Sequence, residues 1–224
     1  MAITALVFDM DGLMLDTEPI YRHAWQCAGG ELGYTLDDEF YETLVGRPNP
    51  DCEAILVRKF GAGFPLEAFR ARWPMLWRSR ADAHGINTKP GLLELLAFAE
   101  KNNLRVAVAT SSDAEYTKFT LGRAGLDDRF EVLVTGDEVQ RGKPNPDIYL
   151  EAARRLAVEP EQCVALEDSE AGIIAASSAG MVALMVPDLI EPSAAARRAA
   201  FRVLTSLLEA PEVVATLSSD LLLG

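Results

Sequence analysis

The chain has 224 residues, of which 49% are hydrophobic and 25% are charged, and its formal net charge at pH 7 is −13. This composition excludes a disordered chain, because enough apolar side chains are present to build a large core. The acidic balance argues against a nucleic-acid partner, since phosphate backbones are bound by stripes of Lys and Arg that this sequence lacks. No obligatory protein partner is indicated.

The N-terminus carries no recognisable export signal. Residues 1–3 lead directly into an apolar segment, without the basic region, long apolar region and cleavage site of a secretory leader. The apolar runs are shorter than the roughly 18 to 20 residues that cross a bilayer. The three cysteines are odd in number and lack a metal-binding spacing, which predicts reduced thiols. We expect a cytoplasmic protein without a membrane partner.

The first predicted strand, residues 3–8, is almost entirely apolar, as in a parallel strand buried on both faces. Two carboxylates, Asp9 and Asp11, follow it. Because side chains alternate along an extended chain, both would face one side at the carboxyl edge of the sheet, where open α/β sheets bind ligands. Two acids with no basic neighbour repel each other and lose hydration there, so we expect a bound metal ion.

Residues 17–88 show helical patterns and no convincing buried strand. Large apolar side chains recur at helical spacing in three groups: Tyr21, Trp25 and Ala28; Leu36, Phe40 and Leu44; and Phe69, Trp73 and Trp77. The tryptophans in these groups are expected to pack in the interior of the segment. We therefore predict an inserted all-helical cap domain over residues 17–88, and a core domain formed by residues 1–16 and 89–224. The two crossings between them predict a hinge.

Strands and helices alternate after the insert. The predicted strands cover residues 104–109, 131–134, 163–166 and 182–186, and the predicted helices cover residues 92–102, 115–124, 148–156 and 171–179. Short connections in this alternation are typical of a doubly wound parallel sheet in the α/β class. Small or polar residues follow the strands, so the loops at the carboxyl edge are predicted to form one site.

The residues after the predicted strands 3–8 and 163–166 suit the cleavage of a phosphate monoester. Asp9 can act as a nucleophile that forms an aspartyl-phosphate, and Asp11 can act as general acid and base. Asp168, with Glu167 beside it, offers further carboxylate oxygens. An all-oxygen site with open positions suits Mg²⁺, which keeps water and substrate phosphate as ligands.

Phosphate also needs positive charge and hydrogen-bond donors. Lys143 supplies a compact charge in a proline-rich turn just before a predicted helix. Thr110, together with the backbone at Ser111, can donate hydrogen bonds to phosphate before another helix. We therefore expect Lys143, Thr110 and Ser111 to bind the phosphate group.

Four motifs occur in order: Asp9-x-Asp11-Gly12, Thr110 after a strand, Lys143 before Pro144, and Glu167-Asp168 followed by Ser169 and Gly172. With these motifs the chain resembles the haloacid dehalogenase (HAD) superfamily, in the branch of beta-phosphoglucomutase and small sugar-phosphate phosphatases. The segments FDMDGLMLDTE, ATSS, GKPNPDIYL and MVPD are similar to the pseudouridine 5′-phosphatase group. The resemblance covers nearly the whole chain.

This resemblance implies a HAD-like Rossmannoid core with a helical cap, a Mg²⁺ cofactor and a small phosphorylated substrate, here a sugar phosphate. It implies that Asp9 is nucleophile and metal ligand, and that Asp11 is acid and base and a ligand through its carbonyl oxygen. Asp168, with Glu167, would complete the metal site. In the cap, Arg47 lies where relatives carry a loop that contacts substrate, so we expect it to bind substrate.

A sugar-phosphate mutase is the main alternative to a phosphatase. Mutases of this branch carry a cap histidine five residues after the acid that corresponds to Asp16, and here that position is Tyr21. They also place an arginine three residues after the loop glycine, where this chain has Asn49. Both differences favour hydrolysis. A phospho-ligand-binding protein without turnover is a second alternative, and a dehalogenase is disfavoured because that chemistry needs neither Asp11 nor a metal.

Overall fold

The computed structural model of the chain describes residues 2–47 and 49–220. The chain divides into two compact units. The helical unit is Thr17–Ile86, and the core unit combines Met1–Asp16 with Asn87–Gly224. Among the described residues, no helix has both the length and the apolar character needed to cross a membrane.

The core unit is built on a six-stranded sheet in the order β3-β2-β1-β4-β5-β6, in which every neighbouring pair is parallel. The strands are β1 (Ala5–Phe8), β2 (Arg105–Ala109), β3 (Val132–Val134), β4 (Cys163–Glu167), β5 (Val182–Met185) and β6 (Arg202–Val203). The predicted doubly wound parallel sheet is confirmed. The two-residue strand β6 was not predicted, because it has no apolar run to reveal it.

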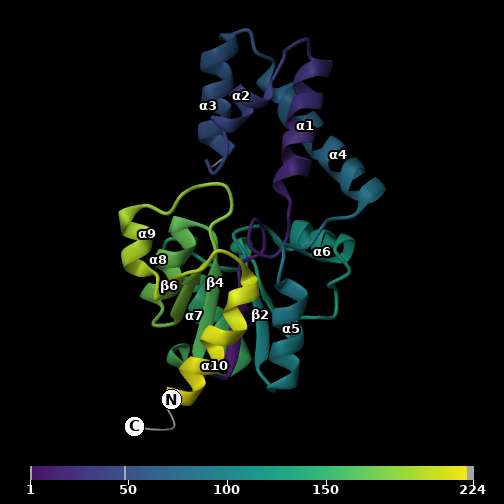
Figure 1. The fold of residues 1–224 in the computed structure, drawn as a ribbon. Helices are drawn as coiled ribbons and strands as arrows, with labels where there is room; N and C mark the ends of the chain where they lie inside the picture. The colour runs from purple at the N-terminus through teal and green to yellow at the C-terminus, as the bar shows by residue number, and fades with distance from the viewer. Residues whose placement is uncertain (1, 48, 221–224) are drawn as a thin grey trace. The chain divides into compact units, whose positions relative to one another are not determined.

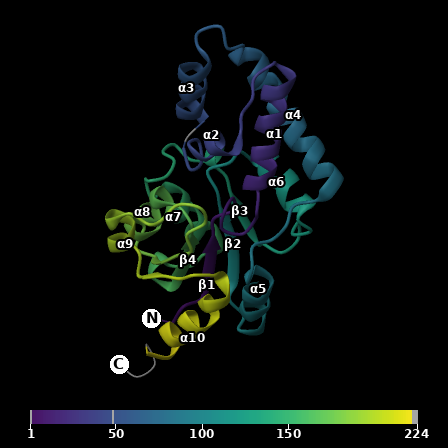
Figure 2. The ribbon, with the colours of Figure 1, turned by 45° about the horizontal axis from the view of Figure 1, so that its top comes forward.

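Helices cover both faces of this sheet. They are α5 (Leu92–Lys101), α6 (Ala114–Arg123), α7 (Asp147–Leu156), α8 (Glu170–Ser178), α9 (Ala194–Ala199) and α10 (Ala210–Asp220), with short 3₁₀ turns at Gly136–Glu138, Pro160–Gln162 and Leu207–Glu209. In Figures 1 and 2, α5 and α6 lie on one side of the sheet and α7, α8 and α9 on the other. This arrangement follows from right-handed crossovers between parallel strands.

Burial on both faces explains the continuous apolar character of β1. Ala5 and Val7 face α7 and α8, where they pack in one cluster with Ile148. Leu6 and Phe8 point to the opposite face and are also fully buried. A strand covered on both sides has no polar positions, so its sequence shows no alternation until it leaves the sheet at Asp9.

The helical unit contains α1 (Glu18–Glu31), α2 (Asp38–Glu42), α3 (Asn49–Phe60) and α4 (Leu66–His84), and no strand among its described residues. Its interior is aromatic. The rings of Trp25 and Phe69 pack edge to face, with their centres 5.1 Å apart. The ring of Trp73 is tilted against that of Trp25, with a distance of 5.9 Å between the centres. Trp25 and Trp77 are buried and Trp73 packs against the same cluster, as their spacing predicts.

The two crossing segments are joined to each other within the core unit. Leu15 pairs antiparallel with Thr88, and the Asp16 amide donates to the Asn87 carbonyl at 2.9 Å. The Lys89 ammonium lies 2.5 Å from Oδ1 of Asp188, which follows β5. The chain thus leaves and re-enters the core unit at one place.

Candidate active site

The register of the sheet sets the position of Asp9. Phe8 is level with Val108 of β2 and with Leu166 of β4, and the Asp9 amide continues the ladder with a 3.0 Å bond to the Leu166 carbonyl. One residue further, Asp9 reaches the carboxyl edge beside Ala109 and Glu167. Its side chain is almost completely buried there.

Lys143 lies among the ends of these three strands. Its ammonium donates to Oδ1 of Asp9, to the Ala109 carbonyl at 2.9 Å and to Oε1 of Glu167 at 2.5 Å. The side chain is only 5% exposed. Burial alone would lower the pKa of Lys143, but the carboxylates of Asp9 and Glu167 raise it above its usual value. The lysine is therefore a fixed positive charge at the end of β1.

Glu167 is fully buried and has donors at both oxygens. Besides Lys143, Oε1 accepts a 2.7 Å bond from the Tyr149 hydroxyl. Oε2 accepts bonds from the Ser169 amide at 3.2 Å and the Ser169 hydroxyl at 3.0 Å. Gly172 lies so close that a Cβ there would overlap this carboxylate. Tyr149 was not predicted to belong to the site, because a packing role in α7 accounts equally well for its position in the sequence.

Three carboxylates at this edge can hold a metal ion. Asp9, Glu167 and Asp168 each offer an oxygen, and these atoms lie within 4.8 Å of one another. Burial raises the pKa of Asp9 to about 7, although Lys143 opposes the shift. Burial and the neighbouring Asp9 raise the pKa of Asp168 as well. A hard divalent cation fits this all-oxygen cluster, since it would stabilise the ionised form of each acid.

Position 12 requires a glycine because the Asp168 side chain lies close to the backbone there. Its φ is +82°, in the left-handed region that favours glycine, and an added Cβ would overlap Oδ2 of Asp168. The turn after Asp11 can therefore lie against the acidic cluster only because the side chain is missing.

The Asp11 carboxylate does not belong to the group of three. Oδ2 accepts a 3.0 Å bond from the Ser112 hydroxyl, and Oδ1 accepts a 2.8 Å bond from the Tyr116 hydroxyl. The two donors flank the start of α6: Ser112 comes just before the capping residue Asp113, and Tyr116 lies in the first turn of the helix. These two partners of Asp11 were not predicted, because they lie 101 and 105 residues away in the chain.

Thr110 and Ser111 follow β2 at the same edge. Thr110 is buried, its amide donates to the Val134 carbonyl at 3.0 Å, and its hydroxyl accepts from the Ser112 amide at 3.1 Å. Ser111 is exposed, and its carbonyl packs against Gly136. Thr110 directly follows Ala109, whose carbonyl accepts a hydrogen bond from Lys143, so Thr110 lies at the same edge of the sheet as the lysine.

Arg47 belongs to the helical unit and is not part of the acidic cluster. Its Nε donates to the Thr43 carbonyl at 2.8 Å. It lines a cavity of about 230 Å³ whose walls include three aromatic residues, Tyr21, Trp25 and Tyr41. The same cavity is lined by Asn49, Glu18 and Cys52.

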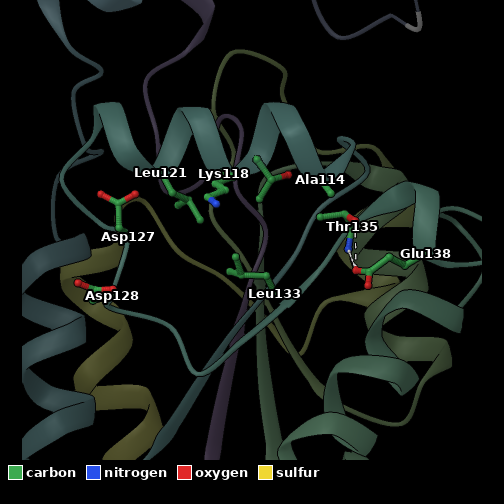
Figure 3. A pocket seen from close by; sticks show the side chains of 9 residues that line it. Ala114, Lys118, Leu121, Asp127, Asp128, Leu133, Thr135 and Glu138 are labelled. Atoms are coloured by element: carbon green, nitrogen blue, oxygen red, sulfur yellow. Dashed lines mark hydrogen bonds between the residues drawn. The ribbon is translucent and has the colours of Figure 1, made fainter.

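A larger cavity, about 420 Å³, lies in the core unit between α6 and β3 (Figure 3). In the figure, Asp127 and Asp128 stand at one end of it, Lys118 points down from α6, and Leu133 lies below. Its lining contains three acids and one lysine, and none of the predicted site residues. This balance of charge does not suit a phosphate group.

Comparisons with known proteins agree with this arrangement. The family of haloacid dehalogenase-like hydrolases matches residues 3–180. A phosphorylated carbohydrates phosphatase of Thermotoga maritima is 35% identical over 177 residues, covering 79% of this chain and 82% of that protein. A beta-phosphoglucomutase of Bacillus subtilis is 32% identical over 190 residues, covering 81% and 82%.

A solved structure shows the same likeness. The crystal structure of CbbY from Rhodobacter sphaeroides in complex with phosphate superimposes with a TM-score of 0.74 at 30% sequence identity, covering 92% of this chain and 96% of that one. The match of the family extends from β1 through α8 and includes every residue of the site at the carboxyl edge. The chain belongs to the haloacid dehalogenase-like hydrolase family, as its motifs indicated.

Proposed function

We propose that the protein is a Mg²⁺-dependent phosphatase that hydrolyses a small organic phosphate monoester, a sugar phosphate, through an aspartyl-phosphate on Asp9. One observation carries the proposal: a buried lysine joins Asp9 to Glu167 at the end of β1, with Asp168 in the same cluster. This arrangement supports the proposal because a carboxylate that can attack phosphorus, a cation that can bind phosphate and oxygens that can bind a metal lie at one edge of the sheet.

In the first step, an oxygen of Asp9 attacks phosphorus and the bond from phosphorus to the ester oxygen breaks. The leaving oxygen takes a proton from Asp11, whose carboxyl group is oriented by Ser112 and Tyr116. Lys143 and Thr110 hold the non-reacting phosphate oxygens. Lys143 can do so because the contact it now makes to Asp9 can pass to the incoming phosphate.

The metal fits the donors that the chain provides. Asp9 and Asp168 would hold Mg²⁺ with carboxylate oxygens, and Glu167 adds negative charge beside them. When bound, the ion supplies the charge neutralisation that lets an anionic carboxylate approach an anionic phosphate. Burial of these acids without a cation is costly, which the raised pKa values of Asp9 and Asp168 express.

In the second step, Asp11 removes a proton from a water molecule that attacks the phosphorus of the aspartyl-phosphate. The bond from phosphorus to Asp9 breaks, which releases inorganic phosphate and restores the carboxylate. The proton now on Asp11 is the one that the next ester needs. A single carboxyl group can therefore serve both steps.

The organic part of the substrate is proposed to bind in the cavity of the helical unit that Arg47 lines. Its aromatic walls can stack on the apolar face of a sugar ring. Tyr21 occupies the position of the mutase histidine and packs instead against the rings of Trp73 and Trp77, at 5.8 Å and 5.6 Å. This packing supports water, rather than a second sugar, as the phosphoryl acceptor.

Phosphate release from sugar, polyol and nucleoside phosphates, measured with and without Mg²⁺, tests the proposal. We expect Mg²⁺-dependent release from sugar phosphates and a covalent phosphoryl adduct on Asp9, detected by mass spectrometry of acid-quenched enzyme. Asp9→Asn should lose both. Turnover in Asp9→Asn at the wild-type rate would refute the proposal, and conversion of a phosphosugar without release of inorganic phosphate would establish the mutase.

A further inference from the structure

The three hydrogens of the Lys143 ammonium have different partners. One points to the Ala109 carbonyl, one to Oε1 of Glu167 and one to Oδ1 of Asp9. Asp9 is the proposed nucleophile, so the hydrogen directed at it is the one that an incoming phosphate takes. The other two contacts then serve as anchors that fix the direction of the third.

The two anchors differ in how they are held. The Ala109 carbonyl belongs to the backbone of β2, which is paired on both sides. Glu167 provides a side chain, and its position depends on its own donors. At the oxygen that binds Lys143, the second donor is the hydroxyl of Tyr149, 2.7 Å away.

Tyr149 reaches this position from the first turn of α7, six residues after Lys143. It is fully buried, and the Lys143 ammonium lies 5.2 Å from the centre of its ring. A phenylalanine would fill the same apolar space. The hydroxyl is therefore the part of this side chain that packing does not explain, and it donates to the carboxylate that anchors the lysine.

We propose that Tyr149 is a positioning residue for phosphate binding. Its hydroxyl fixes Oε1 of Glu167, Oε1 fixes the Lys143 ammonium, and the third hydrogen of that ammonium, which contacts Asp9 here, is thereby directed at the incoming phosphate. The inference rests on the proposed function of Lys143. A purely structural donor would instead satisfy the buried carboxylate without any effect on ligand affinity.

Two variants separate the effect of the Tyr149 hydroxyl from that of its ring. Tyr149→Phe removes only the donor and keeps the ring beside Lys143. We expect KM for the ester and the inhibition constant of inorganic phosphate to rise together by about tenfold, the effect of one hydrogen bond to a charged group. The half-saturating Mg²⁺ concentration and kcat should change by less than about twofold. Tyr149→Leu also removes the ring and should weaken phosphate binding further.

Tyr34→Phe in the helical unit is the matched control, because its hydroxyl only approaches the Gly63 carbonyl at 3.4 Å. It should leave every constant unchanged. A Tyr149→Phe variant that loses stability in urea but keeps the wild-type inhibition constant for phosphate would overturn the inference. A change confined to the Mg²⁺ requirement would overturn it as well.

Calorimetric titration with inorganic phosphate and Mg²⁺ separates this inference from the proposed reaction. A wild-type protein that binds phosphate without turnover would refute the phosphatase, while weaker phosphate binding by Tyr149→Phe would still support the role of Tyr149. Equal phosphate affinity in the two proteins would overturn that role alone. A wild-type protein that does not bind phosphate would overturn both.

Discussion

The hydroxyl of Tyr116 donates a 2.8 Å hydrogen bond to Oδ1 of Asp11, across 105 residues of chain. The Ser112 hydroxyl holds the other oxygen of the same carboxylate at 3.0 Å. The start of α6 thus orients the proposed general acid and base. This contact joins the helix after β2 to the turn after β1. The orientation of the Asp11 carboxylate therefore depends on a residue that is distant in the sequence.

Tyr116→Phe removes one of these two donors and keeps the ring. Because Asp11 must point at the leaving oxygen to protonate it, we expect kcat to fall about tenfold, part of the range that general acid catalysis supplies. Steady-state kinetics with a sugar phosphate measure the change. Lys118→Ala, an exposed change on the same helix, should keep the wild-type kcat. An unchanged kcat in Tyr116→Phe would show that Ser112 alone suffices.

Lys143→Met should affect both turnover and stability. Phosphate release is expected to fall by about 10²–10³, as when a donor to developing charge is removed. Without Mg²⁺, Asp9 and Glu167 would be left buried without their cation, at a cost of about 3–5 kcal/mol in the free energy of unfolding.

Lys89→Met is the matched comparison for stability. Its partner Asp188 is 14% exposed and Lys89 itself is 23% exposed, so solvent screens this pair more than that of Lys143. We expect a loss of about 1 kcal/mol or less. Urea unfolding of the two variants measures the difference. Equal losses would contradict the view that burial makes the Lys143 contacts the more costly ones to break.

Gly12→Ala should weaken the metal site in particular. The new Cβ would overlap Oδ2 of Asp168, and the backbone at +82° is strained for any residue with a Cβ. We expect the half-saturating Mg²⁺ concentration to rise at least about tenfold. Gly30→Ala, where a Cβ meets nothing within 4 Å, should keep the Mg²⁺ requirement. An unchanged requirement in Gly12→Ala would remove Asp168 from the proposed ligands.

The stabilisation of the protein by Mg²⁺ should depend on pH. Burial raises the pKa of Asp9 to about 7, so this carboxyl group is mostly protonated below that pH in the metal-free protein. A protonated carboxyl group is a poor ligand, and the metal must then displace a proton. We expect the rise in melting temperature with Mg²⁺ to be larger at about pH 8 than at about pH 6. Thermal unfolding at several pH values checks this, and a shift independent of pH would contradict it.

The carboxyl edge of the sheet was predictable from the sequence because its signals are local. Residues 3–8 and 163–166 are apolar runs that end in acids, and parallel strands bring such ends together. The contacts that orient those acids were not predictable. Tyr149 lies at the helical spacing of the residues that α7 packs into the core, so its sequence position indicates only a packing role. Its hydrogen bond to Glu167 depends on how α7 packs on the sheet.

Arg47→Ala tests whether the cavity of the helical unit selects the substrate. Arg47 provides a guanidinium group beside the aromatic walls of that cavity, so its loss should change the relative kcat/KM values across a panel of sugar, polyol and nucleoside phosphates. We expect the preferred ester to lose about tenfold and poor esters to lose less, because only the former uses the full set of polar contacts.

Arg58→Ala is the matched control for Arg47→Ala, since Arg58 is an exposed cation of α3 outside the cavity lining. It should leave the order and the ratios of the panel unchanged. If Arg47→Ala lowers all esters by one common factor, the residue contributes general attraction for anions, which a rise in salt concentration would reproduce in the wild-type protein. If Arg47→Ala leaves every kcat/KM value at the wild-type level, Arg47 does not contact the substrate, and specificity must come from other side chains, such as Glu18 and Trp25 of the same cavity.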